Sequence, residues 1–323
     1  MNKAPCTMGI LVALGFLLAG EMAFAASYPA KPVRIIVPYG AGGGVDIQAR
    51  LLAPLFHEWT SKPFIVENRS GASGLIGAEI AARSVADGYT ILFSTATLTI
   101  NKTLYGSRMK IDPVKDLAPI SWIASTPLVL VVHPSVPAKS VKELVGLAKR
   151  KPAFLNSGIV SGSVMQLSAE MLKQKAGIDA VLVPYKSGVP AITALISGEI
   201  DYLFPTAPVA SVAIKSRRAK GLAVTAAKKS SAFPNLPTMN TFYPGFESEN
   251  WYAMWFPAKT PGDIVAKMNQ LIVKALQVAK VREFMIKRGL EPVGSTPEEL
   301  GDQVKRDITR YAEVIRKGNI TLK

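Results

Sequence analysis

The chain has 323 residues, a formal net charge of +15 and a single cysteine, Cys6. Because Cys6 lies in the N-terminal stretch, the rest of the chain has no thiol for a disulfide, a thiolate metal site or a nucleophile. The basic residues are dispersed and lack interleaved aromatic side chains, so we expect a solvated basic surface and no nucleic-acid partner. A diffuse positive field still speeds the association of anionic ligands.

Residues 1–25 predict a secretory signal peptide. Lys3 precedes an apolar run, Gly9–Gly20, and Ala23-Phe24-Ala25 supplies a small-residue cleavage site. The run is shorter than the about 20 residues that a membrane-spanning helix needs. We expect cleavage after Ala25 and a periplasmic protein, with an uncleaved membrane anchor as the alternative.

Short β-branched runs alternate with helix-like stretches along the rest of the chain. This alternation predicts βαβ units and mostly parallel sheets, an α/β fold. The expected strands are Val33–Val37, Phe64–Glu67, Thr90–Phe93, Leu128–Val132, Ala180–Val183, Ile200–Phe204 and Gly221–Thr225. The expected helices are Asp46–Trp59, Val141–Lys149 behind a Ser140–Glu143 capping box, Ser163–Ala176 before Gly177, Gly262–Lys280, and one from the Thr296 capping box to about Lys317.

About 300 mature residues exceed what one core usually organises, so two domains are expected. The chain changes character near Pro119–Pro127 and again near Gly245–Pro257, which we interpret as two crossovers between the domains. Domain I then comprises residues 26–125 plus 250–323, and domain II comprises residues 126–249. Two facing α/β domains form a ligand cleft at the carboxyl ends of their strands, and two crossovers form a hinge.

The first candidate binding segment is the glycine-rich turn Pro38–Asp46. It follows an expected strand and opens a helix, and it holds four glycines within Gly40–Gly44. Such a turn exposes backbone amides at a helix N-terminus, which suits a carboxylate or a phosphate. A tight turn alone would need one glycine. A dinucleotide site is the other alternative, but Val45 stands where the third glycine of G-x-G-x-x-G belongs, although Glu67 could serve the ribose.

Four further loops follow expected strands. They are Asn68–Gly77, Ser94–Thr97, Ser157–Ser163 and Pro184–Gly188. Glycines in the first of these can pack a helix against a sheet, and serines in the third can simply cap a helix. In the last, Lys186 could steer an anion or be solvated. These loops leave a structural and a binding interpretation open.

Catalytic machinery is hard to assemble from this sequence. The two histidines, His57 and His133, are far apart and have no partner at metal-ligand spacing, so we expect no metal. No G-x-S-x-G elbow and no carboxylate pair at expected strand ends occurs. We therefore expect no enzyme and no cofactor.

The chain resembles the Bug-type extracytoplasmic solute receptors, the substrate-binding proteins of tripartite tricarboxylate transporters. The resemblance runs over nearly all of Tyr28–Ile320 and rests on motifs in a fixed order. These include Tyr28–Pro38, Glu67–Arg69, Asp87–Thr90, Asp112–Pro119, Pro137–Leu144, Val183–Lys186, Leu236–Thr238 and Pro292–Glu299. It implies a type II periplasmic-binding-protein fold, with two α/β domains, a ligand cleft and two crossover strands. It also implies a small carboxylate ligand and membrane permease subunits as partners.

The resemblance also implies which residues hold the ligand. In domain I these are Tyr39, Gly42, Gly43, Val45 and Asp46 of the first loop, with Ser94, Thr95, Ala96 and Thr97. In domain II these are Ser157, Gly162, Ser163 and Tyr185.

Two departures from the family pattern bear on the ligand. Val45 replaces a threonine found in many members, and Pro205-Thr206 replaces an Asp-Asn pair. Losing the aspartate removes a docking point for a ligand amine, so we expect a carboxylate without a free amino group, such as an aromatic or hydroxy acid. We expect a monomer. A receptor that presents its ligand to a sensor kinase, and an exported α/β enzyme, are the alternative functions.

Overall fold

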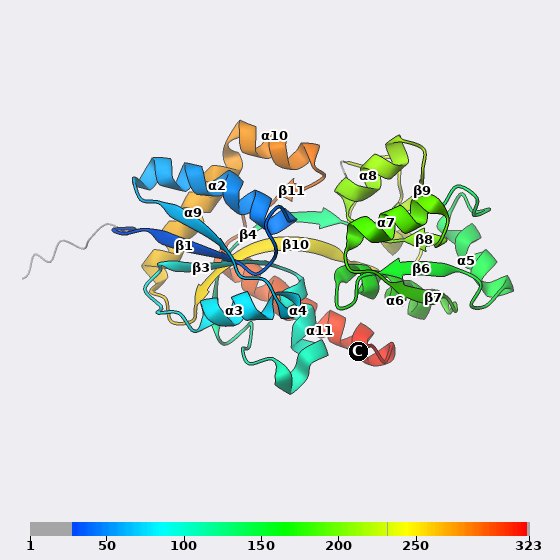
Figure 1. Cartoon of the computed structure of the whole chain (residues 1–323), viewed down its shortest axis with the longest axis horizontal. Coiled ribbons are helices and arrows are strands. Elements are labelled where there is room, and N and C mark those ends of the chain that lie inside the picture. Colours follow the sequence, from blue (N-terminus) through cyan, green and yellow to red (C-terminus); the bar gives the residue numbers. More distant parts are fainter. Residues whose placement is uncertain (1–27, 231, 322–323) are drawn as a thin grey trace, which may run out of the picture.

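The computed structural model describes residues 28–230 and 232–321 and contains two mixed sheets side by side (Figure 1). The predicted signal peptide lies outside the described residues. Among the helices in the described ranges, none has the length and apolar character to cross a membrane. The two sheets with helices on their faces confirm the predicted α/β class. The expectation of mostly parallel sheets is wrong, because Glu249–Pro257 in one sheet and Val129–Val132 in the other run antiparallel to both of their neighbours.

The first sheet has six strands in the order β11-β4-β10-β3-β1-β2. Its strand β1 is parallel to β2 and β3, whereas β10 runs antiparallel to both of its neighbours, β3 and β4. The strands are β1 (Val33–Val37), β2 (Phe64–Asn68), β3 (Thr90–Thr95), β4 (Leu117–Pro127), β10 (Glu249–Pro257) and β11 (Glu291–Pro292).

Helices cover both faces of this sheet, which explains why its strands are apolar on both sides. Neighbouring residues of β1 show the division, because Ile35 belongs to one hydrophobic cluster and Ile36 to the other. One face carries α2 (Gly44–Thr60), α9 (Gly262–Gln277) and α10 (Ala279–Lys287) (Figure 1). The other carries α3 (Leu75–Ala82), α4 (Thr97–Tyr105) and α11 (Pro297–Lys317).

The second sheet has five strands in the order β7-β6-β8-β5-β9. Its strands are β5 (Val129–Val132), β6 (Asn156–Ile159), β7 (Val181–Pro184), β8 (Tyr202–Leu203) and β9 (Lys220–Val224). Its helices are α5 (Val141–Arg150), α6 (Val164–Ala176), α7 (Gly188–Ser197) and α8 (Ala207–Lys215). Short 3-10 turns lie at Ala72–Gly74, Gly106–Arg108 and Met239–Thr241.

The chain passes between the sheets twice. Strand β4 leads through Leu128 into β5, and β10 returns to the first sheet directly after Ser248. Helix α11 also reaches across, because it packs on β4 and α4 and its Val314 carbonyl accepts a 3.0 Å hydrogen bond from Gln174 of α6. The predicted domain boundaries lie at the ends of β4 and β10, and the division at those residues stays a prediction.

Local signals account for several helix ends. Thr296 and Glu299 form the reciprocal capping box at the start of α11, and Gly177 ends α6 in the left-handed conformation. The capping box predicted at Ser140 is only half formed, because the Ser140 hydroxyl accepts from the Glu143 amide but the Glu143 carboxylate accepts from the Lys139 amide. The helix predicted over Gly262–Lys280 is wrong at its end, because extended Val278 divides it into α9 and α10.

Candidate functional site

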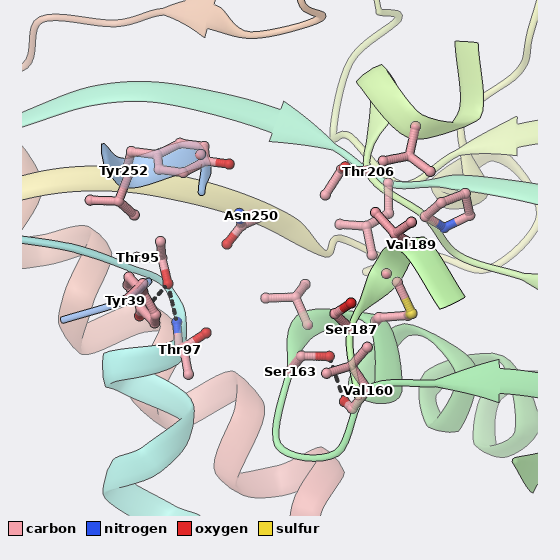
Figure 2. Close-up of a pocket in the computed structure, with 18 of the residues that line it drawn as sticks. Tyr39, Thr95, Thr97, Val160, Ser163, Ser187, Val189, Thr206, Asn250 and Tyr252 are labelled. Carbon is pink, nitrogen blue, oxygen red and sulfur yellow. Dashed lines mark hydrogen bonds between the residues drawn. The ribbon is translucent and has the colours of Figure 1, made fainter. Parts of the chain in front are cut away.

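A cavity of about 430 Å³ lies where the two sheets face each other (Figure 2). From the first sheet and its crossover strands, the lining residues are Tyr39, Gly44, Val45, Thr95, Thr97, Leu128, Asn250 and Tyr252. From the second sheet and its helices, they are Val160, Ser163, Val164, Met165, Lys186, Ser187, Gly188, Val189, Pro205, Thr206 and Val209. Its volume is at the lower end of the range for small-molecule sites, about 300–1,000 Å³.

The loop before α2 is held in shape by the side chains of Asp46 in α2 and Asn68 in β2. Gly42 has a φ of 76°, and its amide donates a 2.9 Å hydrogen bond to the carboxylate of Asp46, one turn further on. Asn68 bridges the Tyr39 carbonyl and Asp46 at 3.1 and 3.0 Å. Helix α2 begins at Gly44 with no side-chain cap, so its first amides lack a partner within the helix and face the cavity.

Asp46 organises this loop and does not line the cavity. It is 3% exposed and also accepts hydrogen bonds from Arg50 Nε at 3.1 Å. Burial raises the pKa of Asp46, but the hydrogen bonds from Arg50, Gly42 and Asn68 outweigh burial and hold that pKa below its usual value. Its negative charge is therefore neutralised on the side of the loop away from the ligand space.

Hydroxyl groups form the floor of the cavity beside this loop. Tyr39 Oη lies 2.9 Å from Thr95 Oγ1 and 3.3 Å from Ser94 Oγ, and the Thr97 amide donates to Thr95 Oγ1 (Figure 2). Burial raises the pKa of Tyr39, so the phenol stays protonated and can donate. These groups come from the ends of β1 and β3, two neighbouring parallel strands.

The crossover strand β10 completes this wall. Asn250 and Tyr252 face the cavity, whereas Trp251 between them is buried on the opposite face and donates a 2.6 Å hydrogen bond to Asp307. A methyl group on Gly44 would lie 2.9 Å from Tyr252 Oη, so the phenol sits directly over the start of α2. Burial raises the pKa of Tyr252 to about 12.

A second glycine turn before α6 lies on the opposite wall. Gly162 has a φ of 72°, and its amide donates a 2.8 Å hydrogen bond to Gln166. The Ser163 hydroxyl donates to the Val160 carbonyl at 2.6 Å and does not cap the helix. Helix α7 also starts at the cavity, behind Ser187, without a side-chain cap.

The electrostatic character of the cavity suits an anion. Among the described residues that line it, none is acidic and Lys186 is the one cation. The N-termini of α2, α6 and α7 all open into it, and each contributes positive partial charge.

The residues predicted from the sequence divide into two groups. Those that line the cavity are Tyr39, Val45, Thr95, Thr97, Ser163, Pro205 and Thr206. Those that do not line it are Gly42, Gly43, Asp46, Ser94, Ala96, Ser157, Gly162 and Tyr185. Most of the second group shape the adjoining turns, but Ser157 is a fully buried residue of β6 inside the second sheet.

Sequence reasoning missed several lining residues, chiefly Tyr252, Asn250 and Gly44. The sequence predicts only a crossover near Gly245–Pro257, but the period-2 alternation within that stretch places Asn250 and Tyr252 on one face. Gly44 was assigned to the turn, although it is the first residue of α2.

The other candidates are engaged elsewhere. Glu67 accepts hydrogen bonds from Arg34 at 2.8 Å and Arg69 at 3.2 Å, so it is not free to bind a ribose. Likewise, the Asn68–Gly77 segment packs α3 on the sheet, since a methyl on Gly77 would lie 2.8 Å from the Arg69 carbonyl oxygen. His57 is exposed on α2, and His133 Nδ1 pairs with Ser135 at 2.7 Å.

Comparisons with known proteins identify the family of this chain. The model of the tripartite tricarboxylate transporter family receptor matches residues 48–320. Protein BugT of Bordetella pertussis is 33% identical over 100% of this chain and 99% of its own length.

Two solved structures are similar throughout. R. palustris Rpa4515 with adipate has a TM-score of 0.80 and 31% identity, covering 91% of this chain and 99% of that chain. MatC from Rhodopseudomonas palustris with bound malate has a TM-score of 0.76 and 27% identity, covering 89% and 100%. The family model, the full-length relative and the shared fold agree, and this chain belongs to the tripartite tricarboxylate transporter receptor family.

Proposed function

We propose that this chain is a periplasmic binding protein that captures a small organic carboxylate in the cavity and delivers it to the membrane subunits of its transporter. The observation that carries the proposal is the uncapped first turn of α2, which opens into a cavity with no acidic lining residue in the described chain. The adipate and malate bound by two structural relatives support the ligand class.

Each group near the first loop has a distinct role in this proposal. The amides of Gly44 and Val45 donate to the ligand carboxylate, and the hydroxyls of Thr97 and Tyr252 complete its shell. Gly42, Gly43 and Asp46 bind indirectly, by holding the turn in shape. Preorganised donors replace the water shell of the carboxylate without a reorganisation cost at binding.

Closure of the two domains buries the ligand. The flexing segments are the passage from β4 to β5 and the return at Ser248 into β10, and the protein acts as a monomer without a catalytic step. A ligand that contacts both walls favours the closed form by its extra contacts there. Size-exclusion chromatography with light scattering checks the monomer.

A carboxylate library tests the function. Residues 26–323 are titrated by calorimetry and thermal shift with small carboxylates and with the matching uncharged amides. We expect one or more carboxylates to raise the melting temperature, while the matching amides leave it unchanged. At a free ligand concentration of a hundred times Kd, binding adds about 2.7 kcal/mol to the free energy of unfolding. Equal binding of acid and amide, or no binding by any carboxylate, contradicts the proposal.

A further inference from the structure

The two walls of the cavity differ in chemical character. The wall on the first sheet carries the side-chain amide of Asn250 and the hydroxyls of Tyr39, Thr95, Thr97 and Tyr252. The facing wall is mostly apolar. Its apolar lining residues are Val160, Val164, Met165, Val189, Pro205 and Val209, with Leu128 at the crossover.

We propose that the ligand is a monocarboxylate whose far end is apolar, held with its carboxylate at the start of α2 and its body against the apolar wall. This inference rests on the proposed function and specifies its substrate class. Apolar side chains gain free energy when a ligand body removes them from water. Val189 is 67% exposed, so a ligand body can bury an apolar surface that the protein alone leaves in water.

A second carboxylate at the far end meets few donors. The Ser163 hydroxyl already donates to the Val160 carbonyl at 2.6 Å. Prolines in the first turns of α7 and α8, Pro190 and Pro208, supply no amide hydrogen. Lys186 is exposed to water, which screens its attraction. The uncapped starts of α6 and α7 and the hydroxyls of Ser187 and Thr206 remain as donors on this wall. They lie among apolar side chains, so a carboxylate placed there loses hydration that these donors replace only in part.

An ammonium at the far end is disfavoured for a related reason. Among the described lining residues no carboxylate is present, and Pro205-Thr206 at this position offers no charge. The amine therefore loses hydration without gaining an ion pair.

The test uses ligands that differ only at the far end. Hexanoate, adipate and 6-aminohexanoate share a six-carbon chain that ends in a methyl, a carboxylate or an ammonium. A rigid pair, p-toluate and terephthalate, covers an aromatic body. We expect the methyl-ended acid to bind at least about tenfold tighter than its charged counterparts in one or both series, which is about 1.4 kcal/mol. Tighter or equal binding of the charged acids overturns the inference, whereas failure of every carboxylate in the library contradicts the proposed function itself.

Substitutions of two exposed valines test where the far end of the ligand lies. Val189→Arg adds a guanidinium at the cavity wall, and Val212→Arg adds one on α8 at a residue that is 72% exposed and does not line the cavity. Because both positions are exposed, both variants should fold. We expect Val189→Arg to reduce the preference for hexanoate over adipate by about tenfold, and Val212→Arg to leave it unchanged. An equal effect of the two variants, or none from Val189→Arg, overturns the placement.

Discussion

The loops before α2 and α6 have the same construction on opposite walls of the cavity. In each, a glycine with positive φ donates its amide to a side chain one turn later, Gly42 to Asp46 and Gly162 to Gln166. The residues around this shared backbone differ. In the first loop the acceptor is charged and bound by Asn68 and Arg50, whereas in the second it is a neutral amide.

The first turns of α2 and α6 also differ in polarity, and again the turn on the first sheet is the more polar of the two. Helix α2 starts with bare backbone at Gly44 under the Tyr252 hydroxyl, and α6 starts with the apolar side chains of Val164 and Met165. One backbone motif can thus present a polar end to a ligand on one wall and an apolar surface on the other. The residue at the first helical position, Gly44 in α2 and Val164 in α6, decides which.

The largest expected effect comes from filling the polar end. Gly44→Leu places a side chain where its Cβ alone would approach Tyr252 Oη to 2.9 Å, so we expect carboxylate affinity to fall by about a hundredfold or more, about 2.7 kcal/mol. Gly40→Ala is the matched control, since a methyl there meets nothing within 4 Å. Calorimetry measures both, and unchanged affinity in Gly44→Leu would refute the assignment of the first loop.

A second variant removes the charged acceptor. Asp46→Ala leaves the Gly42 amide and the Asn68 and Arg50 side chains without their common partner. We expect the free energy of unfolding to fall by about 2 kcal/mol, because hydrogen bonds to a buried charged group are stronger than neutral ones. Urea denaturation measures it, and a loss close to zero would mean that the loop holds its shape without Asp46.

The pH dependence of stability tests the charge itself. The pKa of Asp46 in the folded protein lies below its usual value, so the carboxylate contributes stability above that usual value and loses it as the pH falls through the folded pKa. Asp46→Asn keeps the shape and removes the charge. We expect the wild-type protein to be the more stable at neutral pH and the two denaturation curves to converge in acid. A gap that persists at low pH would assign the effect to shape.

We expect a smaller loss of stability when the neutral acceptor of the loop before α6 is removed. Gln166→Ala removes one hydrogen bond, from the Gly162 amide, and we expect the free energy of unfolding to fall by about 1 kcal/mol. Denaturation under the conditions used for Asp46→Ala gives the comparison. Equal losses in the two variants would show that the charge of Asp46 adds nothing to the first loop.

Local sequence determined the parts of this protein that depend on neighbours in the chain. The glycine turn of Gly42 with Asp46, the Thr296 capping box and the Gly177 helix end each involve residues within about one helical turn. The break at Val278 was missed because the apolar period continues through it. Chain length and the two predicted crossovers indicated two domains, and the resemblance to a known family supplied the type II periplasmic-binding-protein fold.

The tertiary structure decided which side chains meet in the cavity. Ser157 follows the same serine-rich pattern as Ser163, yet only Ser163 lines the cavity, because Ser157 belongs to β6 and lies between two neighbouring strands. Tyr252 and Gly44 come from distant segments, and they meet because β10 pairs with β3 in the first sheet. Strand order and pleat are non-local properties. The sequence alone therefore identified the glycine turn before α2 as a candidate binding segment, and only the folded sheet placed the Tyr252 phenol and the apolar wall around it.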